Sequence, residues 1–146
     1  MRLRSGELTA LVGALTLVGI GFAPWFDERG GHHVDGWSAF GVLYALMLIA
    51  AVAGVTLAVT TATERSPGLP VFTAVWTTLL GLIAVLAAIG RLVHHPASGA
   101  TPAVGAWIAL AASAAIFAGA WQTLRDERTD RYEPAAPEAR PAPPAG

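Results

Sequence analysis

The residues most able to do chemistry in this chain are its four histidines, which form two adjacent pairs: His32 with His33, and His94 with His95. The segment around the first pair also carries three acidic residues: Asp27, Glu28 and Asp35. Imidazole nitrogens and carboxylate oxygens are suitable ligands for zinc, copper or nickel. If the fold brings the two pairs together, they supply three or four ligands, so all four histidines are candidate metal ligands.

Two other interpretations of the histidine pairs stay open. Adjacent histidines lack the i, i+4 spacing that places two rings on one face of a helix, which favours simple solvated loops over a metal site. An imidazole also changes its charge between about pH 5 and pH 8, so the pairs can sense pH. The sequence predicts no cofactor.

The chain lacks the sequence patterns of most enzymes. It has no cysteine, which excludes disulfides, thiolate nucleophiles and thiolate metal sites. No nucleophile elbow, P-loop, dinucleotide fingerprint, HExxH or EF-hand pattern occurs in it. A formal net charge of -1 gives no general attraction to nucleic acid. We therefore expect a protein that is not an enzyme and that does not bind nucleic acid.

The histidine pairs and the nearby acidic residues lie between four long apolar runs, which must position them. The runs cover residues 8–23, 38–61, 71–92 and 103–121. A helix needs about 20 consecutive apolar residues to cross a bilayer, and lipid leaves an isolated spanning segment no partner for its backbone amides other than itself. Charged residues make up only 13% of the chain, against about 25% in an average soluble domain. The sequence therefore predicts an all-α membrane protein that folds as a four-helix transmembrane bundle.

The predicted transmembrane domain covers residues 1–124, with helices over about residues 6–24, 38–62, 70–92 and 102–124. Ser5 is a suitable N-cap for the first helix, and Glu7 falls in its first turn, where a negative charge suits the helix dipole. Thr101-Pro102 is typical of an N-cap followed by proline at the first helical position. Polar loops are expected over residues 24–37 and 91–101.

After Leu124 the composition changes, and residues 125–146 are rich in Pro, Arg and Glu with almost no large apolar side chain. Such a segment cannot bury enough apolar surface to offset the entropy of ordering, so we predict a disordered tail. A Pro-x-x-Pro pattern near the end leaves a docking peptide as the alternative.

The distribution of arginine indicates the orientation, because four spans place both termini on one side of the membrane. Most arginines fall on that side: Arg2, Arg4, Arg65, Arg125, Arg128, Arg131 and Arg140. Only Arg29 and Arg91 fall on the other side, where Arg91 either reaches to lipid headgroups or pairs with an acid of the first loop. The positive-inside rule then places both termini in the cytoplasm. Because the composition is that of a GC-rich bacterium, we expect a multi-pass protein of the bacterial cytoplasmic membrane.

Tryptophans mark the expected membrane interfaces, where indole rings are favoured. Trp25, Trp37 and Trp107 fall near outer helix ends. Trp121 falls near an inner end, whereas Trp76 lies deeper and is either a packing residue or a lipid-facing aromatic.

Small residues recur at four-residue spacing on several faces: Ala50-Gly54-Ala58, Thr73-Thr77-Gly81, Gly105-Ala109-Ser113 and Ala111-Ala115-Gly119. Small side chains let helix backbones approach closely, which is how helices associate in lipid. These faces predict a compact bundle, and one of them could also serve a homo-oligomer or a larger membrane-protein partner.

No Asp, Glu, His, Lys or Arg occurs in residues 8–23, 38–61, 71–90 or 103–121. An ionised group inside the membrane costs about 2.5–3.5 kcal/mol on insertion scales, and proteins keep one there mainly for function. Ion-coupled transporters and proton pumps usually need such groups near the midplane. The sequence therefore argues against both classes.

The junctions of the runs read Pro24-Trp25-Phe26, Gly36-Trp37-Ser38-Ala39-Phe40, Ser66-Pro67-Gly68-Leu69-Pro70-Val71, Leu79-Leu80-Gly81-Leu82 and Gly119-Ala120-Trp121 with Leu124-Arg125-Asp126-Glu127. In these sequences the chain resembles a family of small, uncharacterised actinobacterial four-helix membrane proteins. The likeness covers most of residues 1–127 and excludes the tail. It implies a four-helix membrane fold and no particular activity, and the histidine pairs are not part of the shared pattern.

Together these features predict a non-enzymatic accessory or interaction component that acts in the lipid bilayer through helix packing. One alternative is a component for small-molecule or ion passage or export, and another is a metal or pH sensor at the outer face. A cavity that crosses the bundle would favour passage, and a tightly packed core counts against it.

Overall fold

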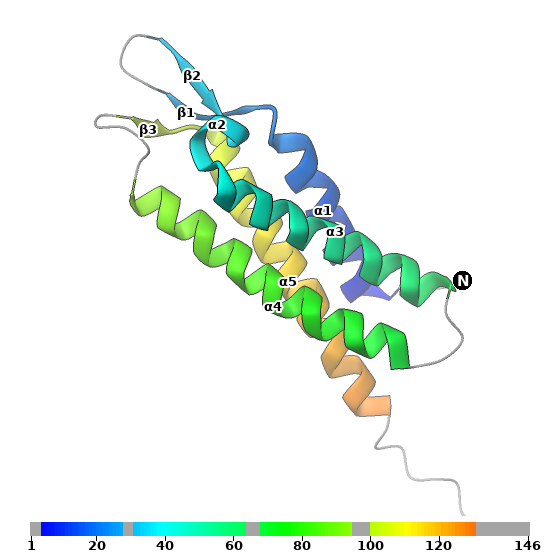
Figure 1. Cartoon of the computed structure of the whole chain (residues 1–146). Coiled ribbons are helices and arrows are strands. Elements are labelled where there is room, and N and C mark those ends of the chain that lie inside the picture. The colour runs from blue at the N-terminus through cyan, green and yellow to red at the C-terminus, as the bar shows by residue number, and fades with distance from the viewer. Residues whose placement is uncertain (1–3, 28–30, 64–67, 95–99, 131–146) are drawn as a thin grey trace, which may run out of the picture.

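The computed structural model of the 146-residue chain describes residues 4–27, 31–63, 68–94 and 100–130. Its elements follow the chain in this order: α1 (Ser5–Ile20), β1 (Pro24–Asp27), β2 (His33–Asp35), α2 (Gly36–Phe40), α3 (Val42–Thr63), α4 (Gly68–Val93), β3 (Thr101–Pro102) and α5 (Val104–Asp130). The prediction of a mostly helical protein is confirmed. Figure 1 shows the long helices α1, α3, α4 and α5 side by side, with the strands gathered at one end.

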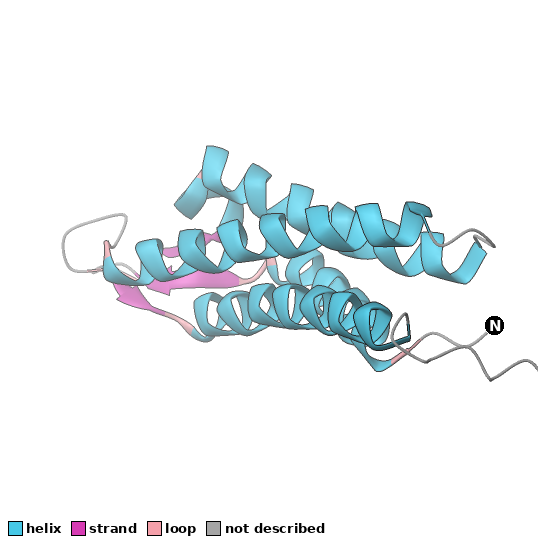
Figure 2. Ribbon diagram, turned by 90° about the horizontal axis from the view of Figure 1, so that it is seen from below, coloured by secondary structure: helices cyan, strands magenta, loops and turns pink. Residues whose placement is uncertain are grey.

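The four long helices run alternately in opposite directions and close into a ring. α1 packs against α3 and α5, and α4 packs against the same two helices. α3 and α5 also contact each other across the middle. Figure 2 shows the bundle along its length, with the sheet at one end, hereafter the strand end, and the N-terminus at the other. The start of α1 and the end of α5 lie together at this opposite end (Figure 1).

Three of the helices are long and apolar enough to cross a membrane: Val42–Thr63, Val71–Val93 and Val104–Asp126. The prediction of apolar helices of membrane length is confirmed for these three. α1 has 16 residues, which at a rise of about 1.5 Å per residue is about 24 Å, against a hydrocarbon core of about 30 Å. It is therefore shorter than the helix predicted over residues 6–24.

α1 ends at Ile20 because the chain turns before the proline at position 24. Gly21 donates a backbone hydrogen bond to Val18, three residues back, and Ala23 donates one to Ile20. A residue before proline is disfavoured in the helical conformation, which affects Ala23. Pro24 begins a strand instead of ending a helix.

The second apolar run, predicted as one helix from residue 38, is broken at Gly41. This glycine has φ 50° and ψ −119°, a backbone conformation that residues with a Cβ rarely adopt. The short α2 lies before the break, capped by Asp35, which accepts a hydrogen bond from the Ser38 backbone N–H at 2.8 Å. α3 starts directly after it at Val42.

α5 begins later and ends later than predicted. Thr101–Pro102, expected as its N-cap and first residue, forms β3 instead. The helix then continues to Asp130, which lies inside the segment predicted as a disordered tail. Residues 131–146, the rest of that predicted tail, lie outside the described residues.

The three strands form an antiparallel sheet in the order β2-β1-β3, where the sequence suggested polar loops. Between β1 and β2 the paired residues are Pro24 with Asp35, Phe26 with Val34 and Asp27 with His33. Between β1 and β3, Phe26 pairs with Pro102 and Asp27 with Thr101. The loop prediction is wrong here because β1 buries Trp25 and Phe26 completely, and buried backbone groups need hydrogen-bond partners.

The backbones of α1 and α5 contact each other directly through glycine. A Cβ on Gly13 would lie 2.7 Å from the carbonyl oxygen of Ala112. A Cβ on Gly6 would lie 2.7 Å from the carbonyl oxygen of Gly119. Because a real Cβ does not approach backbone so closely, only glycine fits at these points, and the seam between the two helices is closed.

Most of the predicted small-residue faces point into the bundle. Ala50-Gly54-Ala58 and Gly105-Ala109-Ser113 are buried throughout, as are Thr77 and Gly81 of the α4 face. The hydroxyl of Thr77 donates to the carbonyl of Ala53 at 3.1 Å, which links α4 to α3. The fourth predicted face, Ala111-Ala115-Gly119 on α5, changes along its length: Ala111 is exposed and Gly119 is buried. The core is therefore built mainly from small residues that let the backbones approach.

The tryptophans divide into outward-facing and buried residues. Trp37, Trp107 and Trp121 are about half exposed, as residues at a membrane interface should be. Trp76 is half exposed too, so of its two predicted roles the outward-facing one is correct. The prediction for Trp25 is wrong, because its side chain is fully buried beneath the sheet.

Candidate functional site

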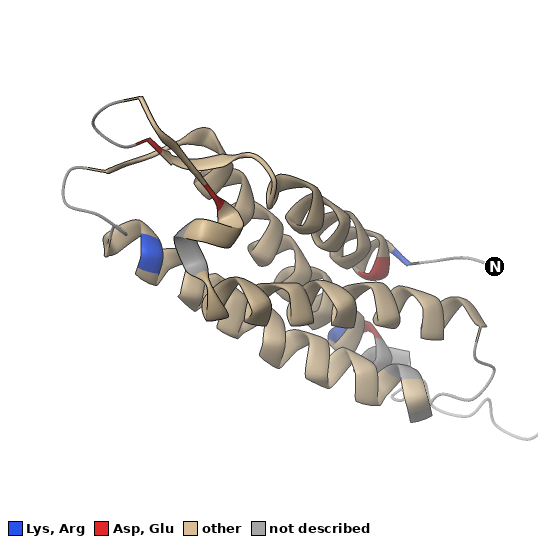
Figure 3. Ribbon diagram, turned by 45° about the horizontal axis from the view of Figure 1, so that its top comes forward, with Lys and Arg blue, Asp and Glu red and all other residues tan. Residues whose placement is uncertain are grey.

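The charged residues that the structure describes lie at the two ends of the bundle, and the helix bodies between them carry none (Figure 3). The strand end holds Asp27, Asp35 and Arg91, together with the described histidines. The opposite end holds Arg4, Glu7, Arg125 and Asp126. Among the described residues, chemistry that needs a charged side chain is therefore confined to these ends.

At the strand end, His33 pairs with Asp27. Nδ1 of His33 lies 2.7 Å from Oδ1 of Asp27, across the first rung of the β1–β2 ladder. Antiparallel pairing places the two side chains on the same face of the sheet. Both remain accessible, with exposed fractions of 67% for His33 and 51% for Asp27.

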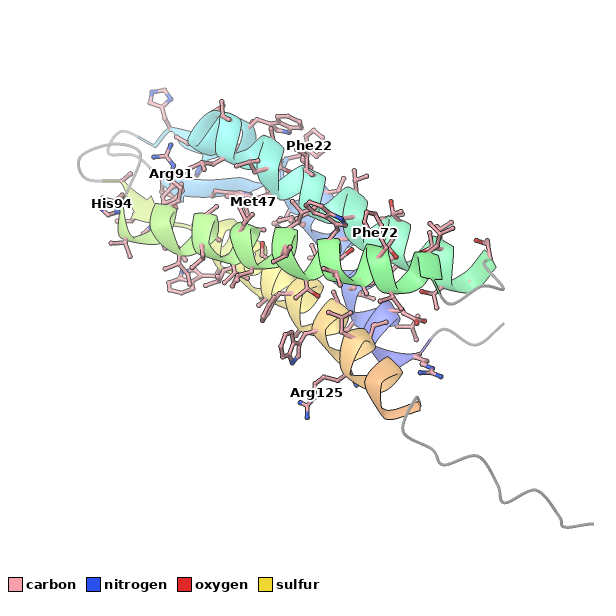
Figure 4. The ribbon with its side chains drawn as sticks, turned by 60° about the horizontal axis from the view of Figure 1, so that its bottom comes forward. Phe22, Met47, Phe72, Arg91, His94 and Arg125 are labelled. Carbon is pink, nitrogen blue, oxygen red and sulfur yellow. The ribbon has the colours of Figure 1, made fainter. Side chains whose placement is uncertain are left out.

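The other histidines do not join this pair in the described part of the chain. His32 and His94 are exposed, and Figure 4 shows His94 just beyond the end of α4. His95 lies outside the described residues, as does Glu28. Within residues 4–27, 31–63, 68–94 and 100–130, no three His, Asp or Glu side chains come together as a metal site. The four-histidine metal site thus stays a prediction.

Asp35 has a structural role at the start of α2. Its carboxylate accepts a hydrogen bond from the backbone N–H of Ser38 at 2.8 Å. This bond most strongly, with the nearby Ser38 hydroxyl and Trp37 backbone N–H, stabilises the ionised form, so the pKa of Asp35 lies below its ordinary value of 3.8. Asp35 is therefore engaged in fixing the turn between β2 and α2.

Arg91 lies in the last turn of α4, beside the sheet. Its side chain is partly buried and its Nε is shielded from solvent. Figure 4 shows the guanidinium directed toward the strands. This placement favours the interpretation in which Arg91 holds the segments of the strand end together over the one in which it reaches out to lipid headgroups.

An aromatic cluster fixes the sheet to the helices below it. Trp25 and Tyr44 meet edge to face with ring centroids 5.5 Å apart, and Trp37 contacts Tyr44 in the same way at 4.8 Å. The indole N–H of Trp25 donates to the carbonyl of Ile20 at 2.7 Å. The hydroxyl of Tyr44 donates to the carbonyl of Leu17 at 3.3 Å. β1 and α3 are thereby both attached to the end of α1.

Beside the His33–Asp27 pair lies an open pocket of about 500 Å³. It is bounded by the end of α1, by β1, β2 and β3, and by the first turns of α5. Its lining residues are Ile20, Ala23, Pro24, Asp27, His33, Pro102, Ala103, Val104, Gly105 and Ile108. Only two of these, Asp27 and His33, carry polar side chains. The pocket thus joins one carboxylate–imidazole pair to an apolar wall.

At the opposite end, Glu7 is buried with an exposed fraction of 1%. Its Oε2 accepts a hydrogen bond from the backbone N–H of Arg4 at 2.8 Å, which caps the first turn of α1. Nearby, the amide of Gln122 donates to the hydroxyl of Ser5 at 3.0 Å and joins α5 to α1. The sequence placed Glu7 in the first helical turn correctly but did not indicate its burial.

A signal for the sheet was present in the sequence but weak. Trp25 and Phe26 precede, and Val34 follows, a segment that contains Gly30 and Gly31. Residues that favour strands on both sides of a short segment with glycine are typical of a β-hairpin with a longer loop. Nothing local indicates the third strand, because it joins the sheet from a segment far along the chain.

Comparisons of the chain with protein-family models, with curated proteins and with solved structures find no match. The predicted resemblance to actinobacterial four-helix membrane proteins therefore stays a prediction. The function has to be inferred from the geometry of the chain itself: an apolar helical bundle with a sheet, an aromatic cluster and a His–Asp pocket at one end.

Proposed function

We propose that the protein is a multi-pass protein of the bacterial cytoplasmic membrane, with four membrane-spanning helices and both termini in the cytoplasm. Three helices support this by length and hydropathy. α1 supports it by lying in the same ring, between α3 and α5, and a span that is a few ångströms short can be met by local thinning of the bilayer. The excess of arginine at the end opposite the sheet supports the orientation.

Cysteine labelling tests this topology, because the chain has no cysteine of its own. We expect a His32→Cys protein to react with a membrane-impermeant maleimide on intact spheroplasts. A Thr63→Cys protein has its cysteine at the last residue of α3, at the end of the bundle opposite the sheet. It should react only after the membrane is opened. The reverse pattern would show the opposite orientation, and recovery of the protein in the supernatant after high-speed centrifugation would refute membrane insertion.

Within that membrane, we propose that the protein is a non-enzymatic accessory component that receives a transmembrane helix of a partner protein on α5. The observation that carries this is the outward face of α5 between Ile108 and Trp121. Its exposed residues there are Ala111, Ala114 and Ala118, hereafter the alanine face. Their i, i+3 and i+7 spacing places them on one side of the helix.

The other long helices expose large side chains instead. On α4 the outward residues over the same depth are Leu79, Leu82, Ile83 and Leu86. Large branched side chains fill the space next to lipid, whereas a row of small ones leaves a groove into which another helix can pack. The small faces of α3 and α4 are used within the bundle, so the alanine face is the one left for an outside partner among the described residues.

The packing of the core argues against passage through a single chain. Direct backbone contact closes the α1–α5 seam at Gly6 and Gly13, and Gly81 approaches the backbone of Phe117 in the same manner. The two pockets described, at Trp121–Asp126 and beside His33, lie at opposite ends of the bundle and do not run along its axis.

Photo-crosslinking tests the alanine face. We expect a diazirine side chain at Ala114 to form a protein–protein adduct in native membranes, because a partner helix covers that position. The same side chain at Leu86, an outward residue of α4, is the matched control and should react with lipid alone. An adduct of twice 15.0 kDa would identify a second copy as the partner. Reaction with lipid alone at both positions would contradict the proposed function.

A further inference from the structure

The pocket at the strand end has two chemically different parts. One part is the His33–Asp27 pair, held at 2.7 Å by the β1–β2 ladder. The other is an apolar wall that includes Ile20, Val104 and Ile108. Val104 and Ile108 are also exposed on the outside of the bundle, with exposed fractions of 72% and 36%. The wall is thus continuous with the apolar surface of the bundle.

The polar part of the pocket accepts hydrogen bonds. In the tautomer with its proton on Nδ1, His33 donates to Oδ1 of Asp27 and keeps Nε2 as an acceptor. Oδ2 of Asp27 is a second acceptor, and no hydrogen bond to it is described. With a neutral imidazole the pair carries a charge of about −1. Two acceptors and a negative charge suit a primary ammonium group, which is a cation with three N–H donors.

The apolar part of the pocket suits a hydrocarbon chain. A ligand that meets both parts has a primary ammonium group at one end and an acyl chain at the other. A quaternary ammonium has the charge but no N–H to donate, and an anionic headgroup would face the carboxylate of Asp27. The bilayer component that combines an ammonium group with acyl chains is an aminophospholipid.

We propose that this pocket binds one molecule of phosphatidylethanolamine, with its ammonium group on Asp27 and His33 and an acyl chain along Ile20 and Ile108. The site is built by two parts of the chain that are distant in sequence: the end of α1 with the β1–β2 hairpin that follows it, and β3 with the start of α5. It does not involve the alanine face, so it stands or falls independently of the proposed partner helix.

Native mass spectrometry of the full chain tests the proposal, using micelles with equal amounts of phosphatidylethanolamine, phosphatidylcholine and phosphatidylglycerol of the same acyl chains. We expect the phosphatidylethanolamine adduct to exceed each of the others by about tenfold, as one charge-assisted hydrogen bond provides. Asp27→Asn should remove this preference. Asp126→Asn, which changes an acid at the opposite end, is the matched control and should leave the preference intact.

Two further arms keep the test decisive. Val104→Trp adds bulk at an exposed rim residue without touching the polar pair, so it should lower retention of phosphatidylethanolamine even if Asp27→Asn fails to fold. Excess glycerophosphoethanolamine, the headgroup without acyl chains, should not displace the lipid, and displacement would show a soluble ligand instead. Equal retention of the three lipids by the wild type, or an unchanged preference in Asp27→Asn, would overturn the proposal.

Discussion

A Gly13→Ala protein should be less stable than the wild type by about 1–3 kcal/mol in its free energy of unfolding, the usual cost of overpacking a well-packed core. The added methyl group would lie 2.7 Å from the carbonyl oxygen of Ala112 and 3.0 Å from the Cβ of Ala115. To relieve these close contacts, α1 and α5 would have to move apart where their backbones touch. Equilibrium unfolding in mixed micelles, followed by far-UV circular dichroism, measures the change.

Gly19→Ala is the matched control on the same helix, because a Cβ at Gly19 would meet nothing within 4 Å. Alanine is favoured over glycine inside a helix by about 1 kcal/mol. Gly19→Ala should therefore leave the free energy of unfolding unchanged or raise it. Gly13→Ala should lower it, even though alanine is the better helix former at that position too. If the two substitutions change stability in the same direction, direct backbone contact between α1 and α5 is not what holds these helices together.

Replacing Trp25 by alanine should produce the largest loss of stability in the chain, about 3–5 kcal/mol, as expected for removing a fully buried large aromatic side chain. The substitution removes the edge-to-face contact with Tyr44 and the hydrogen bond to the carbonyl of Ile20. Both interactions attach β1 to the helices, so the amides of β1 and β2 should also lose protection against hydrogen exchange.

Trp107→Ala serves as the control for Trp25→Ala, since Trp107 is an outward residue at the start of α5. Exposed substitutions away from packed contacts usually change stability by less than about 0.5 kcal/mol. Trp25→Phe should fall between the two, because it keeps most of the buried ring but loses the N–H donor. Similar losses for Trp25→Ala and Trp107→Ala would show that the sheet is not fixed to the bundle through Trp25.

The candidate site was only partly predictable. The sequence placed His33 and Asp27 in one polar segment, and the structure shows them paired. The pocket beside them could not be predicted, because Pro102, Ala103 and Val104 come from a segment more than 60 residues away along the chain. Nothing in their local sequence indicates which edge of which strand they will meet.

The sequence by itself determined that the protein is mostly helical, and it gave the approximate position of the long apolar helices. Length and hydropathy are properties of each segment alone, and a membrane-length apolar segment has few alternatives to a helix. The same local reasoning identified Glu7 in a first helical turn and the small residues along α3, α4 and α5.

The tertiary structure alone decided which features face inward and what lies at the strand end. Trp25 is buried because Tyr44 of α3 and the glycines at positions 36 and 105 pack against its ring. The second apolar run is broken because Gly41 turns the chain between α2 and α3. It also decided that the small faces of α3 and α4 are used inside the bundle while the alanine face of α5 is left outside. The physical reason is that burial and strand pairing depend on contacts between distant segments, and a helix or strand pattern read locally does not specify its neighbours.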